Sequence, residues 1–187
     1  MPTYDVTPDD ESMLTHYKAV LASVKLPVYV YNIPRNAVNN VSPELMKKLV
    51  EAGIAGVKDS SRDFIQVMEY LQALPPTSTV ICGTDSYILP ALLMGAKGAI
   101  TGYANAFPEI YAQLWKAYKD GRSEEARQLQ FRVNSLRKLL QKPAVSPHYE
   151  ALRMRGIDCG NPRAPLRAMT EKETLSLREQ LTKLGVL

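Results

Sequence analysis

The chain has 187 residues, of which 45% are hydrophobic and 22% are charged, with a formal net charge of +4. This length and composition suit one sizeable globular core, and no apolar stretch is long enough to span a bilayer. There is no signal pattern, and the two cysteines and two histidines are too widely spaced to indicate a metal site. We therefore expect a cytoplasmic protein with neither membrane nor nucleic-acid partners, whose basic residues lie on solvated helix faces.

Helical and extended patterns alternate along the first 121 residues. In chain order they predict a helix at 13–24, a strand at 27–31, a helix at 43–52, a strand at 54–58, a helix at 63–74, a strand at 79–82, a helix at 87–94, a strand at 98–101 and a helix at 108–119. Ser42 is the expected N-cap before Pro43, and Gly53 ends the same helix. Such alternation predicts parallel strands buried on both sides, as in a TIM barrel or a doubly wound sheet.

The character of the chain changes after Gly121. Helices are predicted at 123–141, 146–155 and 170–184, with Ser123 as the cap of the first and a loop at 158–165. We therefore expect a β/α core over residues 1–121 that carries the site, and a helical extension over residues 122–187 packed on that core.

Polar or glycine residues close every predicted strand. Tyr31 ends the first strand and Lys58 the second, and the turns 83–86 and 101–105 follow the others. Neighbouring strands lie about 4.8 Å apart, so Tyr31 and Lys58 are expected to meet at one edge of the sheet. Burial favours a neutral lysine amine, which can form a Schiff base, and a tyrosine hydroxyl can move protons beside it. Alternatively, the Lys58 amine lies in water or pairs with Asp59, Tyr31 is a rim aromatic, and both turns are plain connections.

Tyr31-Asn32-Ile33-Pro34, followed one β/α unit later by Gly56-Val57-Lys58-Asp59-Ser60, resembles the dihydrodipicolinate synthase/N-acetylneuraminate lyase family. That family consists of TIM-barrel class I aldolases and related lyases that use pyruvate or another 2-oxo acid. The resemblance covers nearly the whole chain. Further matching segments are 83–85, 92–100, 104–105 and 163–166.

The resemblance implies a role for each matching residue. Lys58 would form the Schiff base with the 2-oxo acid, and Tyr31 would relay protons while a carbon–carbon bond to an aldehyde is made or broken. No cofactor is implied, and a homo-oligomer is expected, in which Tyr4 would reach a neighbouring subunit's site. The residues implied to line the substrate pocket are Ser60, Gly83, Asp85, Ile100, Gly102 and Tyr4.

The match covers only part of the family's barrel. We count four β/α units plus a strand stub at 2–5, without the first strands and the loop that binds the substrate carboxylate, so the expected fold is a partial (β/α)8 barrel from a truncated chain. The unpaired edge strands of such a partial barrel predict dimerisation or pairing with a missing half. The alternative function is therefore a non-catalytic half-barrel or assembly partner. A phosphate- or nucleotide-binding domain has little support, because no glycine-rich fingerprint follows a strand.

The loop after the first strand also departs from the family pattern. Synthase members carry an arginine two residues beyond the proline, where this chain has Asn36, with Arg35 one place earlier, and Val38 replaces the usual glycine. These differences argue against the lysine-pathway synthase activity. The segment 58–60 looks more like aldolase branches that act on keto-deoxy sugar acids or hydroxy-oxoglutarate.

Overall fold

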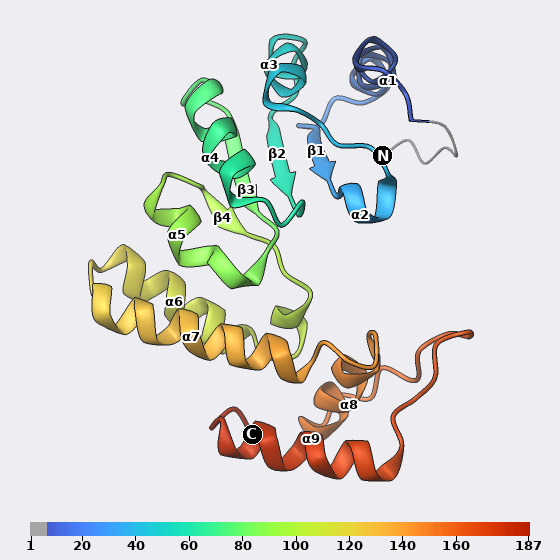
Figure 1. Cartoon of the computed structure of the whole chain (residues 1–187), viewed down its shortest axis with the longest axis vertical. Coiled ribbons are helices and arrows are strands. Elements are labelled where there is room, and N and C mark those ends of the chain that lie inside the picture. The colour runs from blue at the N-terminus through green and yellow to red at the C-terminus, as the bar shows by residue number, and fades with distance from the viewer. Residues whose placement is uncertain (1–6) are drawn as a thin grey trace. The chain divides into compact units, whose positions relative to one another are not determined.

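A computed structural model describes residues 7–187. The chain forms two compact units, one ending at Ile100 and the other beginning at Thr101 (Figure 1). The first unit is shorter than the core expected to end at residue 121. The reason is that the helix α6 (Pro108–Lys119) packs against the next helix, α7 (Ser123–Leu139), within the second unit.

The first unit contains a parallel sheet. Among the residues that the structure describes, four strands are hydrogen-bonded in sequence order, with β1 and β4 at the edges. This confirms the predicted α/β class, and each strand lies within about two residues of its predicted position. The strands are β1 (Tyr29–Asn32), β2 (Gly56–Asp59), β3 (Thr79–Cys82) and β4 (Gly98–Ala99).

Helices cover one face of this sheet, as Figure 1 shows. Apolar side chains from the strands, among them Val30, Val57 and Val80, pack beneath them and are almost completely buried. Because successive side chains of a strand point to opposite faces, every second strand residue belongs to this core. The covering helices are α1 (Asp10–Ser23), α3 (Pro43–Glu51), α4 (Phe64–Ala73) and α5 (Ile88–Leu93).

Among residues 7–100, no helix covers the opposite face of the sheet. Tyr29 is 43% exposed and Tyr31 is 40% exposed, whereas the alternate residues of the same strand, Val30 and Asn32, are fully buried. The expectation that the strands are buried on both sides is therefore wrong for the first unit taken alone. The physical reason is that the helices of residues 7–100 lie on one face only.

Two short helices follow strand ends of the first unit. η1 (Asp85–Tyr87) follows β3, and α2 (Pro34–Ala37) lies in the segment expected to be a loop. Val38 ends α2 with φ of 64°, in the left-handed region that favours glycine. This conformation gives a physical reason why a glycine suits the position that Val38 occupies.

The boundaries of α3 follow the sequence signals. The Ser42 side chain accepts a hydrogen bond from the Leu45 N–H, as an N-cap does, and Gly53 has φ of +115° beyond the end of the helix. The prediction that Ser123 is the N-cap of α7 is wrong. Arg122 occupies the N-cap position, and the Ser123 hydroxyl instead donates to the Gly121 carbonyl at 3.4 Å.

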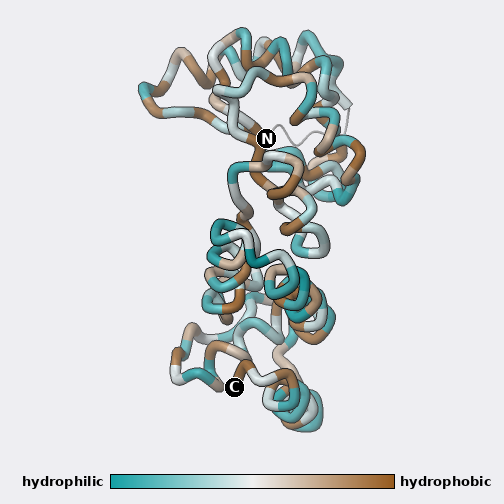
Figure 2. Tube along the Cα trace, turned by 90° about the vertical axis from the view of Figure 1, so that its left-hand side faces the viewer, coloured by the Kyte–Doolittle hydropathy of each residue, from teal (hydrophilic) through white to brown (hydrophobic). Residues whose placement is uncertain are grey.

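The second unit is helical, with η2 (Tyr103–Asn105), α6, α7, α8 (Ser146–Met154) and α9 (Glu171–Lys183). Each α-helix of this unit mixes hydrophobic and hydrophilic residues, as Figure 2 shows, and buries some of its side chains. Among residues 7–187, no helix is both long enough and apolar enough to cross a membrane.

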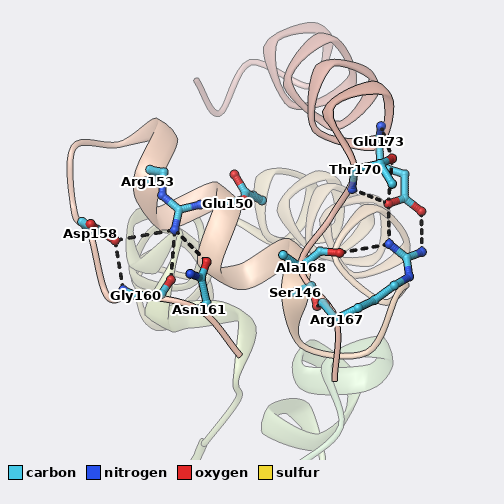
Figure 3. A network of polar contacts seen from close by, with 10 residues as sticks. All are labelled: Ser146, Glu150, Arg153, Asp158, Gly160, Asn161, Arg167, Ala168, Thr170 and Glu173. Carbon is cyan, nitrogen blue, oxygen red and sulfur yellow. Dashed lines mark hydrogen bonds and ion pairs between the residues drawn. The ribbon is translucent and has the colours of Figure 1, made fainter. Parts of the chain in front are cut away.

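Two arginines make polar contacts along the long connection between α8 and α9 (Figure 3). Arg153 pairs with Glu150 and donates to the Gly160 carbonyl at 3.0 Å. Arg167 makes two hydrogen bonds of 2.7 Å to Glu173, whose carboxylate also accepts from the Thr170 N–H. Thr170 and Glu173 form a capping box, which ties the connection to the first turn of α9.

Candidate active site

Tyr31 and Lys58 meet at the carboxyl ends of β1 and β2. The two residues are partners in the parallel register, and the Lys58 Nζ lies 3.9 Å from the centre of the Tyr31 ring. An ammonium in this position is attracted to the face of the ring. The structure thus places an amine and a phenol together where the sequence expected them, and their catalytic roles remain predictions.

Both side chains lie on the open face of the sheet. Lys58 is half-buried and Tyr31 is exposed, so within this unit the amine is neither deeply enclosed nor fully in water. The structure does not pair Lys58 with Asp59, which was the other interpretation. Asp59 points to the opposite, buried face and accepts its hydrogen bonds there from other groups.

Asn32 and Asp59 occupy the buried face directly behind the pair. Both are completely buried, and the Asn32 amide donates to the Asp59 carboxylate at 2.8 Å. The Asn32 oxygen also accepts from the Val41 N–H at 3.0 Å. These bonds satisfy polar groups whose burial is otherwise costly.

Two residues of α4 extend this network. Gln66 donates to the Tyr70 hydroxyl at 3.0 Å, and the Tyr70 hydroxyl donates to the Val41 carbonyl. Burial, reinforced by the negative charge of Asp59, raises the pKa of Tyr70 well above its ordinary value. Sequence reasoning missed this network, although the polar Asn32 and Asp59 at core-facing strand positions were a usable signal.

The turns after β2 and β3 pack tightly against each other. The Ser60 N–H donates to the Asn32 carbonyl at 2.8 Å, and the Gly83 N–H donates to the Asp59 carbonyl at 2.7 Å. The Ser60 hydroxyl lies 3.4 Å from the Gly83 carbonyl. A Cβ at Gly83 would approach the Ser60 Oγ to 2.1 Å and the Asp59 oxygen to 2.5 Å, so only glycine fits there. The structure therefore brings Ser60 and Gly83 together.

The remaining residues expected to line the substrate pocket are Asp85, Ile100, Gly102 and Tyr4. Asp85 is buried at the start of η1, and Ile100 is 51% exposed with its N–H bonded to the Cys82 carbonyl at 2.9 Å. Gly102 belongs to the second unit, where its carbonyl accepts from the Asn105 amide at 2.9 Å. Tyr4 and the expected strand stub lie outside the described residues.

Two ionisable groups near η1 are held in their neutral forms. Burial raises the pKa of the Cys82 thiol to about 12 and the pKa of Tyr87 to about 12. Cys82 is therefore an inert core residue rather than a nucleophile. Within residues 7–187, no three His, Cys, Asp or Glu side chains gather as metal ligands do.

The family model described as the dihydrodipicolinate synthetase family matches residues 1–184. A 4-hydroxy-tetrahydrodipicolinate synthase of Archaeoglobus fulgidus is 33% identical over 96% of this chain and 63% of its own length. An uncharacterised DapA-like lyase of Halobacterium salinarum is 37% identical over 96% of this chain and 59% of its own length. The chain thus spans less than two thirds of these relatives.

Solved structures share the fold of this chain. A dihydrodipicolinate synthetase homologue from Pseudomonas aeruginosa superposes with a TM-score of 0.92 at 26% identity, covering 98% of this chain and 64% of that one. YagE, an E. coli K12 prophage protein of the dihydrodipicolinic acid synthase family solved in complex with pyruvate, has a TM-score of 0.86 at 26% identity over the same shares of the two chains.

Proposed function

Because the chain belongs to the dihydrodipicolinate synthetase family, we propose that it makes or breaks a carbon–carbon bond between a 2-oxo acid, such as pyruvate, and an aldehyde. The observation that carries this proposal is the Lys58 amine 3.9 Å from the centre of the Tyr31 ring at adjacent strand ends. A lysine amine at that edge of a parallel sheet is placed where substrates of such folds bind.

In the proposed reaction, the Lys58 side chain loses its proton and the free amine attacks the C2 carbonyl of the 2-oxo acid. The new carbon–nitrogen bond gives a carbinolamine, whose oxygen leaves as water to form the Schiff base. Loss of a proton from C3 then gives an enamine that attacks the aldehyde carbon, and hydrolysis frees the product and the amine. The Tyr31 hydroxyl relays the protons of these steps. Cleavage is the same sequence in reverse.

The proposal extends to the substrate pocket and to the assembly. Its lining residues would be Ser60, Gly83, Asp85, Ile100, Gly102 and Tyr4. The protonated imine itself withdraws electrons from the bond that breaks, so the chemistry needs no dissociable cofactor. We further propose that the protein works in the cytoplasm as a homo-oligomer, and that its four β/α units are part of a (β/α)8 barrel.

The second candidate is a non-catalytic partner in assembly. It is favoured by the open face of the sheet, where Tyr29, Tyr31 and Ile100 are all substantially exposed. An exposed apolar sheet face of this kind serves as a contact surface for further β/α units as readily as it serves as the wall of a substrate pocket.

Reduction with borohydride in the presence of pyruvate tests the proposed reaction. The expected result is a reduced pyruvate adduct on the peptide that contains Lys58, and its absence in Lys58→Arg, which keeps the charge but lacks a nucleophilic amine. Lys97→Arg, at an exposed lysine of the same unit, is the matched control and should be modified on Lys58 as the parent chain is. An unmodified Lys58 in a folded chain would contradict catalysis and favour the assembly role.

A further inference from the structure

The pair that we assign to catalysis is backed by a second pair on the opposite face of the same two strands. Asn32 follows Tyr31, Asp59 follows Lys58, and Asn32 and Asp59 are themselves register partners joined by a 2.8 Å hydrogen bond. We propose that Asn32 and Asp59 are positioning residues that fix the ends of β1 and β2 so that the Lys58 amine and the Tyr31 ring face each other. This inference rests on the function proposed above.

Asp59 is held from three elements at once. Its Oδ1 accepts from the Ser61 N–H at 3.1 Å and from the Ser61 hydroxyl at 2.6 Å. Its Oδ2 accepts from the Asn32 amide at 2.8 Å and from the Gln66 amide at 3.4 Å. A carboxylate can only accept, and all four of these groups, from three residues, are donors. The donors come from β1, from the turn after β2 and from α4, and together they fix where Asp59 and hence the end of β2 lie.

Asn32 performs the corresponding task for β1. Its oxygen accepts from the Val41 N–H at 3.0 Å, while its amide nitrogen donates to the Asn40 oxygen at 3.0 Å and to Asp59. The segment that leaves β1 and contains α2 is therefore tied back to the strand end that it left. Tyr70 strengthens this closure, because its hydroxyl donates to the Val41 carbonyl. Only a side chain that both donates and accepts can make these bonds.

The open face gives the reacting residues little support of their own. Tyr31 is 40% exposed and Lys58 is half-buried, whereas Asn32 and Asp59 are completely buried. Within the first unit, the placement of the amine over the ring therefore depends on the buried face behind it. A displacement of about 1 Å between reacting groups is enough to slow a reaction about a hundredfold.

Asp59→Asn tests the inference with almost no change of shape. The new amide nitrogen is a donor and faces either the Asn32 amide or the Ser61 donors, so at least one hydrogen bond is replaced by a repulsive contact. The exchange Asn32→Asp with Asp59→Asn restores one donor and one acceptor across the two strands. Asp63→Asn is the matched control, because Asp63 lies on the exposed N-cap of α4 and asparagine also caps helices.

Two measurements read the result. The first is the rate of borohydride-trapped adduct formation as a function of pyruvate concentration. The second is the ring-current shift of the Lys58 methylene protons in the NMR spectrum, which the Tyr31 ring causes and which does not depend on catalysis. In Asp59→Asn we expect the saturated trapping rate to fall about a hundredfold with little change in half-saturating pyruvate, and the ring-current shift to be lost. The double exchange should recover part of both, and Asp63→Asn should match the parent chain.

A folded Asp59→Asn chain with the parent ring-current shift and a trapping rate within about twofold would overturn the inference. If this variant does not fold, Tyr70→Phe, which removes one oxygen from the same network, takes its place. It should slow trapping about threefold or more and weaken the shift, and unchanged values would overturn the inference. If the parent chain forms no adduct, the proposed function fails, and the ring-current shift alone then decides the positioning role.

Discussion

The two units use polar side chains in different ways. In the first, the polar network of Asn32, Asp59, Gln66 and Tyr70 is buried and joins strand ends to a helix. In the second, the ion pairs of Arg127 with Glu124 and of Arg167 with Glu173 lie at the surface. Removing one member of a buried network leaves its partners without hydrogen bonds, whereas water and salt replace a lost surface pair. The first unit is therefore expected to be sensitive to single substitutions in this buried network, and the second unit tolerant of substitutions in these surface ion pairs.

The largest effect is expected when the buried carboxylate is removed. Asp59→Ala leaves the donors of Asn32, Ser61 and Gln66 without an acceptor. We expect the free energy of unfolding of the first unit to fall by about 3 kcal/mol. Peptide-resolved hydrogen exchange measures this unit separately from the other. Glu124→Ala removes the exposed partner of Arg127 and should leave protection of the second unit nearly unchanged. Equal losses in the two units would break the comparison.

A somewhat smaller effect is expected at the turn after β3. Gly83→Ala places a Cβ against the Ser60 and Asp59 atoms, and we expect about 2 kcal/mol of destabilisation in chemical denaturation followed by hydrogen exchange. Gly102→Ala is the counterpart in the second unit. It has ordinary φ of −68° and nothing within 4 Å of an added Cβ, so its stability should not fall. A tolerated Gly83→Ala would show that the two turns are not packed as described.

Alkaline pH should affect the first unit through Tyr87. Burial raises its pKa to about 12 from an ordinary value of 10, so the folded unit keeps a proton that the unfolded chain releases. This contribution to stability is present below pH 10 and is lost as the pH rises towards 12. Tyr87→Phe should flatten the fall in stability over that range, measured by the melting temperature at each pH. An unchanged slope in this variant would contradict the assignment to Tyr87.

The smallest effect is expected in the second unit at acidic pH. The Arg155 guanidinium hydrogen-bonds Glu109 and lowers the pKa of that carboxyl to about 2 from an ordinary value of 4.5. Its contribution is present above pH 4.5 and is lost as the pH falls towards 2. The pair is exposed, so the acid-induced change in melting temperature should be slight. In Arg155→Met this change with pH should be smaller still. A steep acid transition that disappears in Arg155→Met would reverse the ranking of the units.

Much of the fold could be predicted from local patterns. The alternation of apolar runs with helical segments located the strands, and the Ser42 and Gly53 signals located the ends of α3. Strand periodicity also put Tyr31 and Lys58 at neighbouring strand ends. Polar Asn32 and Asp59 at core-facing strand positions signal a buried polar site, but their hydrogen-bond partners could not be predicted, because Asn32 meets Asp59 and Tyr70 across 27 and 38 residues of chain. The open face was missed because an apolar strand pattern does not say which of its faces a neighbouring element covers.

By itself, the sequence determined the order of the elements, the parallel α/β class, the family and the residues at the ends of the strands. These follow from periodicity, capping and motif spacing, which act over a few residues. Only the tertiary structure decided that Lys58 lies over the Tyr31 ring on an open face and that Asp59 turns away from it into a buried network. The physical reason is that burial and hydrogen-bond partners depend on which distant segments pack together, and no local pattern encodes that choice.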